Sequence, residues 1–196
     1  MKNKEIQEKR MKEYFIQATR NILKSEGIKG ISVRNIADQA GYSYATLYNY
    51  FKDVNDLVFL CVNDFQKECK EYTINQTSKT SDGIDKLKKI VMAYIGYFIE
   101  YPGIFDLFYI APIGDFGTKQ STIDVINNSL DEVCETQWNY CITHNIYTSV
   151  QVGILKNKLK YTVIGLLLLY LNRRSPKSYS EFMNNANKEV EQLIRN

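Results

Sequence analysis

The sequence has few of the residues that interrupt helices, with 3 prolines and 10 glycines in 196 residues. This scarcity favours long helices over many short strands. The 4 cysteines form no Cys-x-x-Cys pair, which favours free thiols in a reducing compartment. The longest apolar run, Tyr161–Leu171, is shorter than the about 20 residues that a membrane helix needs. Residues 1–13 are highly charged, unlike a secretory segment, so we expect a cytoplasmic protein that binds no membrane.

Positive charge is concentrated near the N-terminus. Residues 1–53 contain ten Lys or Arg against six Asp or Glu, and the rest of the chain is nearly neutral. This distribution fits a phosphate-facing module joined to a neutral body.

Apolar residues recur at helical spacing through most of the chain, which predicts an all-α fold. Gly27 and Gly41 are predicted stops, and Ser32, Ser43 and Asp53 are predicted N-caps. We expect a polar loop over residues 76–83 and another after Pro112 that contains Gly114 and Gly117. The predicted helices cover residues 4–25, 33–40, 44–51, 54–75, 84–101, 104–110, 119–145, 149–173 and 177–195.

The two short helices on either side of Gly41, supported by a longer preceding helix, predict a helix-turn-helix. In the second short helix Leu47 and Phe51 lie about 40° apart and mark the buried side. Ala45 and Asn49 then face away from the core. The Asn49 amide can pair with adenine, and Ala45 or Thr46 can contact a thymine methyl group.

These segments resemble the tetracycline-repressor (TetR) family of transcriptional regulators. The similarity runs through Thr19–Gly27, Ser32–Ala37 and Ala40–Lys52, and the Thr46-Leu47-Tyr48-x-Tyr50-Phe51 core is its most specific part. The resemblance implies that Ser32 and Arg34 contact the DNA backbone and that Tyr50 and Lys52 face phosphates. It implies base or phosphate contacts for Ser43, Tyr44, Ala45, Thr46 and Tyr48, to which the helical geometry adds Asn49.

One position departs from the family. Many members carry Lys at the start of the fourth helix, where this chain has Val54. Without this phosphate contact we expect a lower affinity for the DNA backbone, unless the basic N-terminal residues Lys2, Lys4, Lys9, Arg10 and Lys12 replace the contact. Tyr48 could also brace the turn with its ring, and Tyr44 and Asn49 could be solvated surface.

The last two predicted helices are candidates for a homodimer interface, because a second copy is needed to read a palindromic site. The 159–171 segment is apolar nearly all round, so it needs burial on every side. The alternative is the central core helix of a monomer. The predicted interface residues are Leu159, Val163, Leu166, Leu167, Tyr170, Phe182, Ala186, Val190 and Leu193.

The middle helices resemble the effector-binding region of the family. Apolar and aromatic groups with a few polar tips are typical of a ligand pocket, although ordinary core is the alternative for each of them. The candidates are Tyr94, Phe98, Phe105, Phe108, Tyr109, Trp138 and Tyr161. Few charges occur in these segments, which favours a neutral or apolar ligand.

Other functions have weaker support. His144, the single histidine, has no Glu-x-x-His partner, and no P-loop, dinucleotide motif or nucleophile elbow occurs, so we expect no enzyme, no cofactor and no metal. Cys134 and Cys141, near His144, could instead form a thiol or metal sensor. A DNA-binding protein without an effector, or one that packages DNA regardless of sequence, also stays open.

The sequence therefore predicts a DNA-binding domain over residues 1–53 and an effector-binding and dimerisation domain over residues 54–196. The expected partners are a double-stranded DNA operator, a second copy of the chain and a small-molecule effector. Members of the family usually act as repressors, so we expect repression of transcription.

Overall fold

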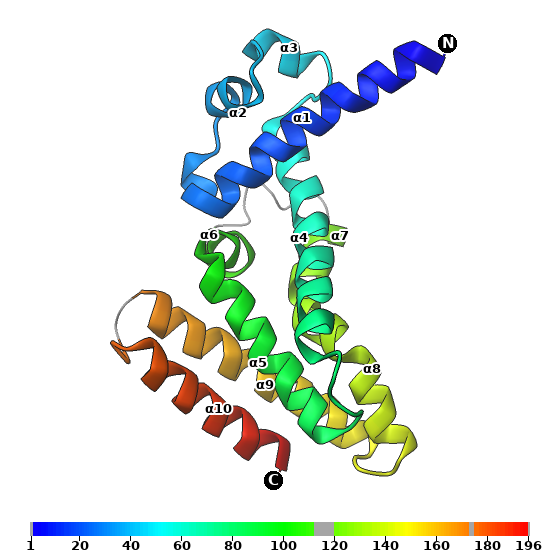
Figure 1. The fold of residues 1–196 in the computed structure, drawn as a ribbon, viewed down its shortest axis with the longest axis vertical. Coiled ribbons are helices and arrows are strands. Elements are labelled where there is room, and N and C mark those ends of the chain that lie inside the picture. The colour runs from blue at the N-terminus through cyan, green and yellow to red at the C-terminus, as the bar shows by residue number, and fades with distance from the viewer. Residues whose placement is uncertain (1, 112–119, 173–174, 196) are drawn as a thin grey trace. The chain divides into compact units, whose positions relative to one another are not determined.

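The computed structural model describes residues 2–111, 120–172 and 175–195 (Figure 1). Every regular element in these ranges is helical and none is a strand, so the all-α prediction is confirmed. Residues 119 and 173 of two predicted helices, and the loop predicted after Pro112 with Gly114 and Gly117, lie outside the described residues.

The chain forms two compact units. The first contains residues 1–66 and 101–126, and the second contains residues 67–100 and 127–196. Helix α4 (Val54–Thr77) begins in the first unit and ends in the second.

The first unit is built around helix α1 (Lys2–Glu26). A short 3-10 turn, η1 (Ile28–Gly30), leads into α2 (Val33–Ala40) and α3 (Tyr44–Tyr48), and α2 packs on both α1 and α3. Their apolar faces share one core with the start of α4, as the predicted helical spacing requires. Its buried members are Phe15, Ala18, Ile22, Ile36, Leu47, Phe51 and Leu57.

The first unit also contains α6 (Pro102–Phe105), a π-helical turn η2 (Asp106–Ile110) and most of α7 (Gln120–Asn127). Helix α6 meets α1 backbone to backbone. A Cβ added at Gly103 would lie 2.1 Å from the Leu23 carbonyl oxygen and 3.0 Å from the Gly27 Cα. Gly27 itself has a φ of 69°, a left-handed value that favours glycine. Only a residue without a side chain fits at position 103.

Several predicted helix boundaries differ from the structure by a few residues, and three of the differences have a clear local reason. Helix α3 ends at Tyr48 instead of Phe51, because the Tyr50 and Phe51 N–H groups both donate to the Leu47 carbonyl at 3.0 Å and tighten the chain into a turn. Helix α6 starts at Pro102 instead of Ile104, because proline suits the first helical position. The helix predicted over 119–145 is interrupted at Asn128, which separates α7 from α8 (Ser129–Thr143).

The second unit is a helical bundle. It contains α5 (Ile84–Glu100), α8, α9 (Ser149–Leu171) and α10 (Tyr179–Arg195), together with the end of α4. Helix α5 packs on α8, α9 and α10, and α9 also packs on α8 and α10. Helix α9 starts with a capping box between Thr148 and Gln151.

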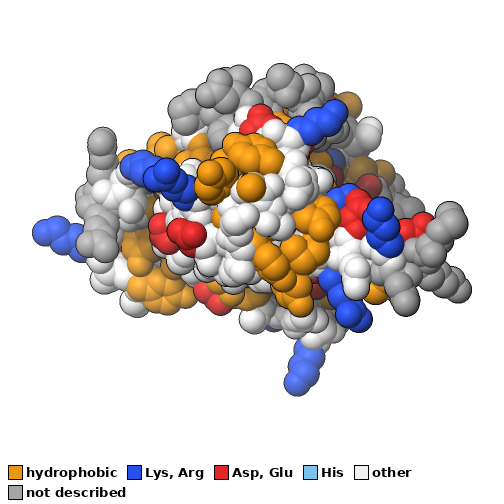
Figure 2. Space-filling view, turned by 90° about the horizontal axis from the view of Figure 1, so that it is seen from above, with side chains coloured by type: hydrophobic (Ala, Val, Ile, Leu, Met, Phe, Trp, Pro, Cys, Tyr) orange, Lys and Arg blue, Asp and Glu red, His pale blue; other side chains and the backbone are white. Residues whose placement is uncertain are grey.

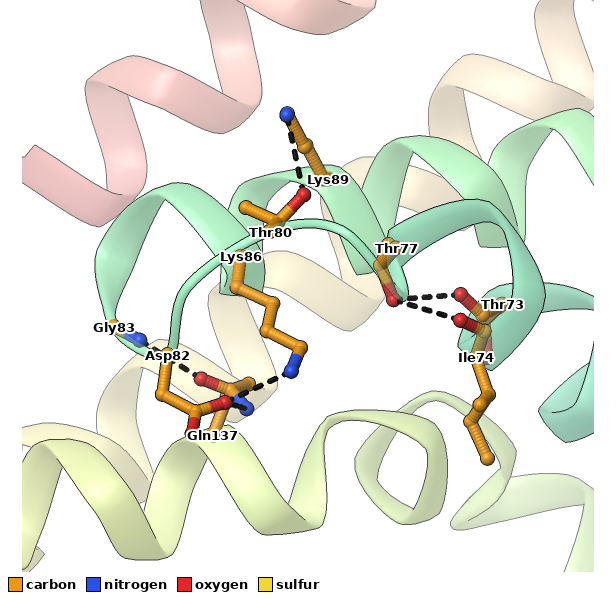
Figure 3. Close-up of polar contacts among 9 residues, drawn as sticks. All are labelled: Thr73, Ile74, Thr77, Thr80, Asp82, Gly83, Lys86, Lys89 and Gln137. Carbon is orange, nitrogen blue, oxygen red and sulfur yellow. Dashed lines mark hydrogen bonds and ion pairs between the residues drawn. The ribbon is translucent and has the colours of Figure 1, made fainter.

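A polar network ties the loop after α4 to α8 within the second unit (Figure 3). The Gln137 side chain is buried, and its Oε1 accepts a hydrogen bond from the Gly83 backbone N–H at 2.9 Å. Its Nε2 donates to Asp82 Oδ1 at 2.9 Å, and Lys86 Nζ donates to the same oxygen. The bonds from Lys86 and Gln137 hold the pKa of Asp82 below its usual value. The buried Gln137 amide therefore fixes the loop to α8, with both its oxygen and its nitrogen hydrogen-bonded.

No single described helix is long and apolar enough to cross a bilayer. Among the described residues, only α5 joined to the α6–η2 segment across the break at Tyr101 has the length and the apolar composition of a membrane span.

We expect Gly103→Ala to lower the free energy of unfolding by about 1–3 kcal/mol, because the new methyl group overlaps the α1 backbone. Urea unfolding followed by circular dichroism measures the change. Gly153→Ala is the matched control, since no atom lies within 4 Å of its added Cβ in α9. The control should stabilise the protein by about 0.5–1 kcal/mol, as expected for glycine in a helix interior. Equal effects of the two substitutions would contradict the close approach of α6 to α1.

Candidate nucleic-acid interface

The turn between α2 and α3 is held by local backbone chemistry. Ser32 caps α2, and its Oγ accepts from the Asn35 N–H at 3.1 Å. Gly41 ends α2 in the left-handed conformation with a φ of 78°. Ser43 caps α3, and its Oγ accepts from the Thr46 N–H at 3.2 Å. The stops and caps predicted at these three residues are confirmed.

Helix α3 buries one face and exposes the other. Leu47 has no exposed surface and Phe51, just after the helix, is 8% exposed. Tyr44 and Tyr48 are 59% and 53% exposed. Because the buried side chains lie in the common core of the first unit, the remaining surface of α3 is free to meet a partner.

Most of the predicted DNA-contacting residues lie on the surface of the first unit. The exposed ones are Ser32, Arg34, Ser43, Tyr44, Ala45, Tyr48, Asn49 and Lys52. Thr46 is half-buried, and its hydroxyl lies 2.9 Å from that of Ser43. Tyr50 is also half-buried and packs against the core, with its ring centre 6.3 Å from that of Phe15. Ser32, Ser43 and Tyr50 thus have structural contacts within the first unit, and their DNA contacts stay a prediction.

Exposed tyrosines extend this surface beyond the predicted residues. Tyr42 lies between the two short helices, and its ring centre is 6.0 Å from that of Tyr14 and 5.7 Å from that of Phe15. Tyr14 is 52% exposed. Figure 2, the space-filling view from above, shows side chains of the hydrophobic class, to which tyrosine belongs, near the centre, with Lys and Arg side chains around them. Sequence reasoning missed Tyr42, although its place between Gly41 and the Ser43 cap is a usable signal.

The predicted ligand-pocket residues divide between the two units. Phe105 and Phe108 are buried in the first unit and Tyr109 is half-buried there. A small apolar cavity of about 20 Å³ lies in the same unit between α4, η2 and α7. Its lining is Val58, Phe59, Val62, Leu107, Ala111, Thr122, Ile123 and Ile126.

In the second unit Tyr94, Phe98 and Trp138 are buried. The Tyr94 and Phe98 ring centres are 4.9 Å apart, and the Tyr94 hydroxyl donates to Ser129 Oγ at 3.0 Å. The Trp138 indole N–H is buried and has no hydrogen-bond partner among the described residues. Tyr161 differs from these residues because it is 70% exposed on α9, so it does not belong to an interior pocket of this unit.

Six of the nine predicted dimer residues are core residues of the same chain. Leu159, Val163 and Leu167 of α9 are at most 1% exposed, because they face the interior of the second unit. Phe182, Ala186 and Val190 of α10 are equally buried. The prediction that these six residues form the interface is therefore wrong, because they pack within the chain. The other three, Leu166, Tyr170 and Leu193, are half-buried.

The exposed side of α9 nevertheless has several apolar side chains, whereas the exposed side of α10 is mostly polar. The exposed side chains of α9 include Ile154, Tyr161, Leu168 and Leu169. An open groove lies between α9 and α10. Its α9 side includes Tyr161, Leu166 and Leu169, and its α10 side includes Asn185, Lys188 and Glu189. Exposed apolar side chains that gather on one helix can mark an interaction site.

The cysteines are poorly suited to sensing. All four thiols are buried, and burial raises the pKa of Cys134 and of Cys141, which keeps them protonated near neutral pH. Cys134 and Cys141 lie two helical turns apart on α8, about 10 Å along the axis. His144 stacks on Tyr140 with ring centres 3.9 Å apart. The described residues contain no cluster of three metal-ligating side chains.

Residues 15–60 match the family of bacterial regulatory proteins described as the tetR family. No curated protein matches the sequence. The match confirms the resemblance seen in the sequence and covers the core, the turn and α3 of the first unit.

The whole chain resembles solved structures of transcription regulators. A TetR family transcription regulator from Marinobacter aquaeolei has a TM-score of 0.66 at 16% identity, over 98% of each chain. The transcriptional regulator FadR from Bacillus subtilis, solved in complex with stearoyl-CoA, has a TM-score of 0.69 at 15% identity, over 92% of this chain and 96% of that one. A tetR-family regulator from Streptomyces coelicolor has a TM-score of 0.66 at 16% identity, over 94% of this chain and 79% of that one. At such identities the likeness shows a shared fold.

Proposed function

We propose that this chain, whose residues 15–60 match the tetR family of bacterial regulatory proteins, is a repressor released from a palindromic operator by a small, largely apolar ligand. The observation that carries the proposal is α3, whose core-facing residues are buried while Tyr44 and Tyr48 are more than half exposed. A capped helix that presents such a surface has the geometry needed to enter a major groove.

We assign base contacts to the outward residues of α3 and phosphate contacts to the residues around it. Ala45, Thr46 and Asn49 have the methyl, hydroxyl and amide groups that read base edges. Arg34 and Lys52 are exposed cations at the starts of α2 and of the turn into α4. Ser43, Tyr44 and Tyr48 reach bases or the sugar-phosphate backbone, and Ser32 and Tyr50 lie nearer the backbone. Tyr42 and Tyr14 border this surface and add aromatic area to it.

Two copies of the chain read the two halves of the operator. One short helix supplies modest affinity, and two-fold DNA sites mirror two-fold protein symmetry. The exposed apolar surface of α9, with the groove that α10 completes, is the surface that we assign to the second copy. The interface is then formed by Tyr161, Leu166 and Leu169, in place of the residues that the same helices bury within the chain.

The effector that suits the buried residues is apolar with at least one hydrogen-bond acceptor. Burial of Tyr94, Phe98 and Trp138 among other apolar groups disfavours a charged ligand end at these positions. A buried donor without a partner costs about 1–3 kcal/mol, and a ligand carbonyl or hydroxyl oxygen would satisfy the Trp138 N–H. The FadR structure holds stearoyl-CoA, whose stearoyl chain is apolar and whose thioester carbonyl is a hydrogen-bond acceptor, although its coenzyme A part is charged.

Ligand binding and DNA binding are coupled through α4. This helix is continuous through both units, from Val54 next to the DNA-binding helices to Thr77 in the bundle. A ligand that prefers one tilt of α4 changes the distance between the two DNA-binding helices α3 of the dimer, and so weakens operator binding.

We expect Tyr48→Ala to weaken binding to an operator, selected from random duplexes, by about 10- to 100-fold. The side chain is half exposed, so the far-UV circular dichroism spectrum and the melting temperature should stay close to those of the wild type. Fluorescence anisotropy of a labelled duplex measures the affinity. Tyr179→Ala, which removes a 56% exposed tyrosine from α10, should bind DNA as the wild type does. A collapsed spectrum for Tyr48→Ala would instead make Tyr48 a structural residue.

We expect Leu169→Glu to convert the dimer into a folded monomer. The side chain is 47% exposed in the single chain, so the charge costs little in the monomer but is buried in the proposed interface. Sedimentation velocity measures the mass. Ile74→Glu, at a 56% exposed position on α4, should stay dimeric. Identical masses for Leu169→Glu and the wild type would rule out this surface as the interface.

We expect the fluorescence of Trp138, the single tryptophan, to change when an apolar effector binds. Stearoyl-CoA and stearyl alcohol are suitable first probes, since one has a charged head and the other does not. Trp138→Phe should bind the same compound about 5- to 150-fold more weakly by calorimetry, the loss expected for one buried donor. Binding that changes neither operator mobility nor the distance between spin labels on the two α3 helices would refute coupling through α4.

A further inference from the structure

The first turns of α1 are exposed on every side. Each residue from Lys4 to Arg10 is exposed, and the first fully buried side chain of the helix is Phe15. A helical segment of this length without packing is marginal in water. The segment therefore has surface available to a partner on all its faces.

The exposed segment lies within residues 2–12, which we term the N-terminal arm and which are basic. Met11 and Lys12, at the end of the arm, are half-buried, and Met11 packs against the core of the first unit. The arm contains five Lys or Arg residues and two Glu residues. Lys12 forms an ion pair with Glu8 at 3.0 Å. Lys4, Lys9 and Arg10 have no ion pair within the described residues, so three cations of the arm are available to an anionic partner.

The arm starts beside the recognition segment. The Tyr14 ring, on the turn that follows the arm, lies 6.0 Å from the ring of Tyr42, one residue before the Ser43 cap of α3. From Tyr14 the arm continues for about 18 Å at 1.5 Å per residue. Figure 1 shows the arm projecting from the first unit at the N-terminal end of α1, whereas the other end of α1 meets α6.

We propose that the N-terminal arm is a second DNA-contacting element, which lies along the phosphates that flank the half-site read by α3. This inference rests on the proposed DNA-binding function and extends it. An 18 Å arm covers about five base pairs at 3.4 Å per pair along one strand. Lys4, Lys9 and Arg10 supply the charge that Val54 does not supply at the start of α4, and phosphate contacts of this kind raise affinity without reading sequence.

Salt dependence separates this role from a solvated surface helix. We compare the wild type with the triple variant Lys4→Gln, Lys9→Gln, Arg10→Gln on two duplexes, the selected operator and a random 40-base-pair sequence, over about 50–300 mM KCl. The slope of log affinity against log salt should fall by about 0.9 for each lost phosphate contact, up to about 3 per chain. Both duplexes should lose affinity by a similar factor, because the arm reads no bases.

A second triple variant, Lys70→Gln, Lys79→Gln, Lys177→Gln, is the matched control. It removes the same charge from exposed positions of the second unit and should keep the wild-type slope. Equal slopes for the two triple variants would overturn the arm proposal while leaving operator recognition by α3 intact. A wild type that binds neither duplex at low salt would overturn the proposed function and the arm with it.

Hydrogen exchange gives an independent readout. The backbone amides of residues 4–10 should exchange more slowly when the operator duplex is added, because contact with phosphates stabilises a helix that has no packing of its own. Unchanged exchange in the arm, with slower exchange in α3, would contradict the proposal and support recognition by α3 alone.

Discussion

Burial of one face of α3 against α1 and α2 is the constraint on which the rest of the first unit depends. Leu47 has no exposed surface and shares a core with Phe15 and Ile36, so the five-residue helix is held by tertiary packing instead of by its own hydrogen bonds. The same contact decides which side chains face outward. Tyr44 and Tyr48 are exposed because Leu47, between them in sequence, is buried.

Small residues make this packing possible by letting backbones turn or approach. Gly41 takes the left-handed conformation that lets α3 start soon after α2, and the Ser43 Oγ then accepts from the Thr46 N–H in the first turn of α3. Gly103 has a different role, since its missing side chain brings α6 onto the end of α1. The helix that supports recognition is therefore in backbone contact with the segment that leads into η2 and its neighbouring apolar cavity.

The second unit has a packed core, a buried N–H group without a partner among the described residues, and apolar side chains on the exposed side of α9. Gln137 is fully satisfied and secures the loop after α4 to α8, whereas the Trp138 N–H next to it in sequence has no partner among the described residues. Helix α9 likewise buries Leu159, Val163 and Leu167 yet leaves Tyr161 and Leu169 exposed. Its apolar residues therefore serve two surfaces of one helix, one inside the chain and one available to a second copy.

The sequence by itself determined the helical class, the caps at Ser32 and Ser43, the stop at Gly41 and the family of the N-terminal segment, because these depend on local backbone preferences and on spacing along one helix. Only the tertiary structure decided which apolar side chains are core. Phe182, Ala186 and Val190 have the spacing of an interface, yet they face α5 and α9 of the same unit, since periodicity marks a buried face without naming what covers it. Likewise Tyr161 belongs to an apolar run but is exposed, and Tyr42 joins the recognition surface through contacts with α1, a helix distant in sequence.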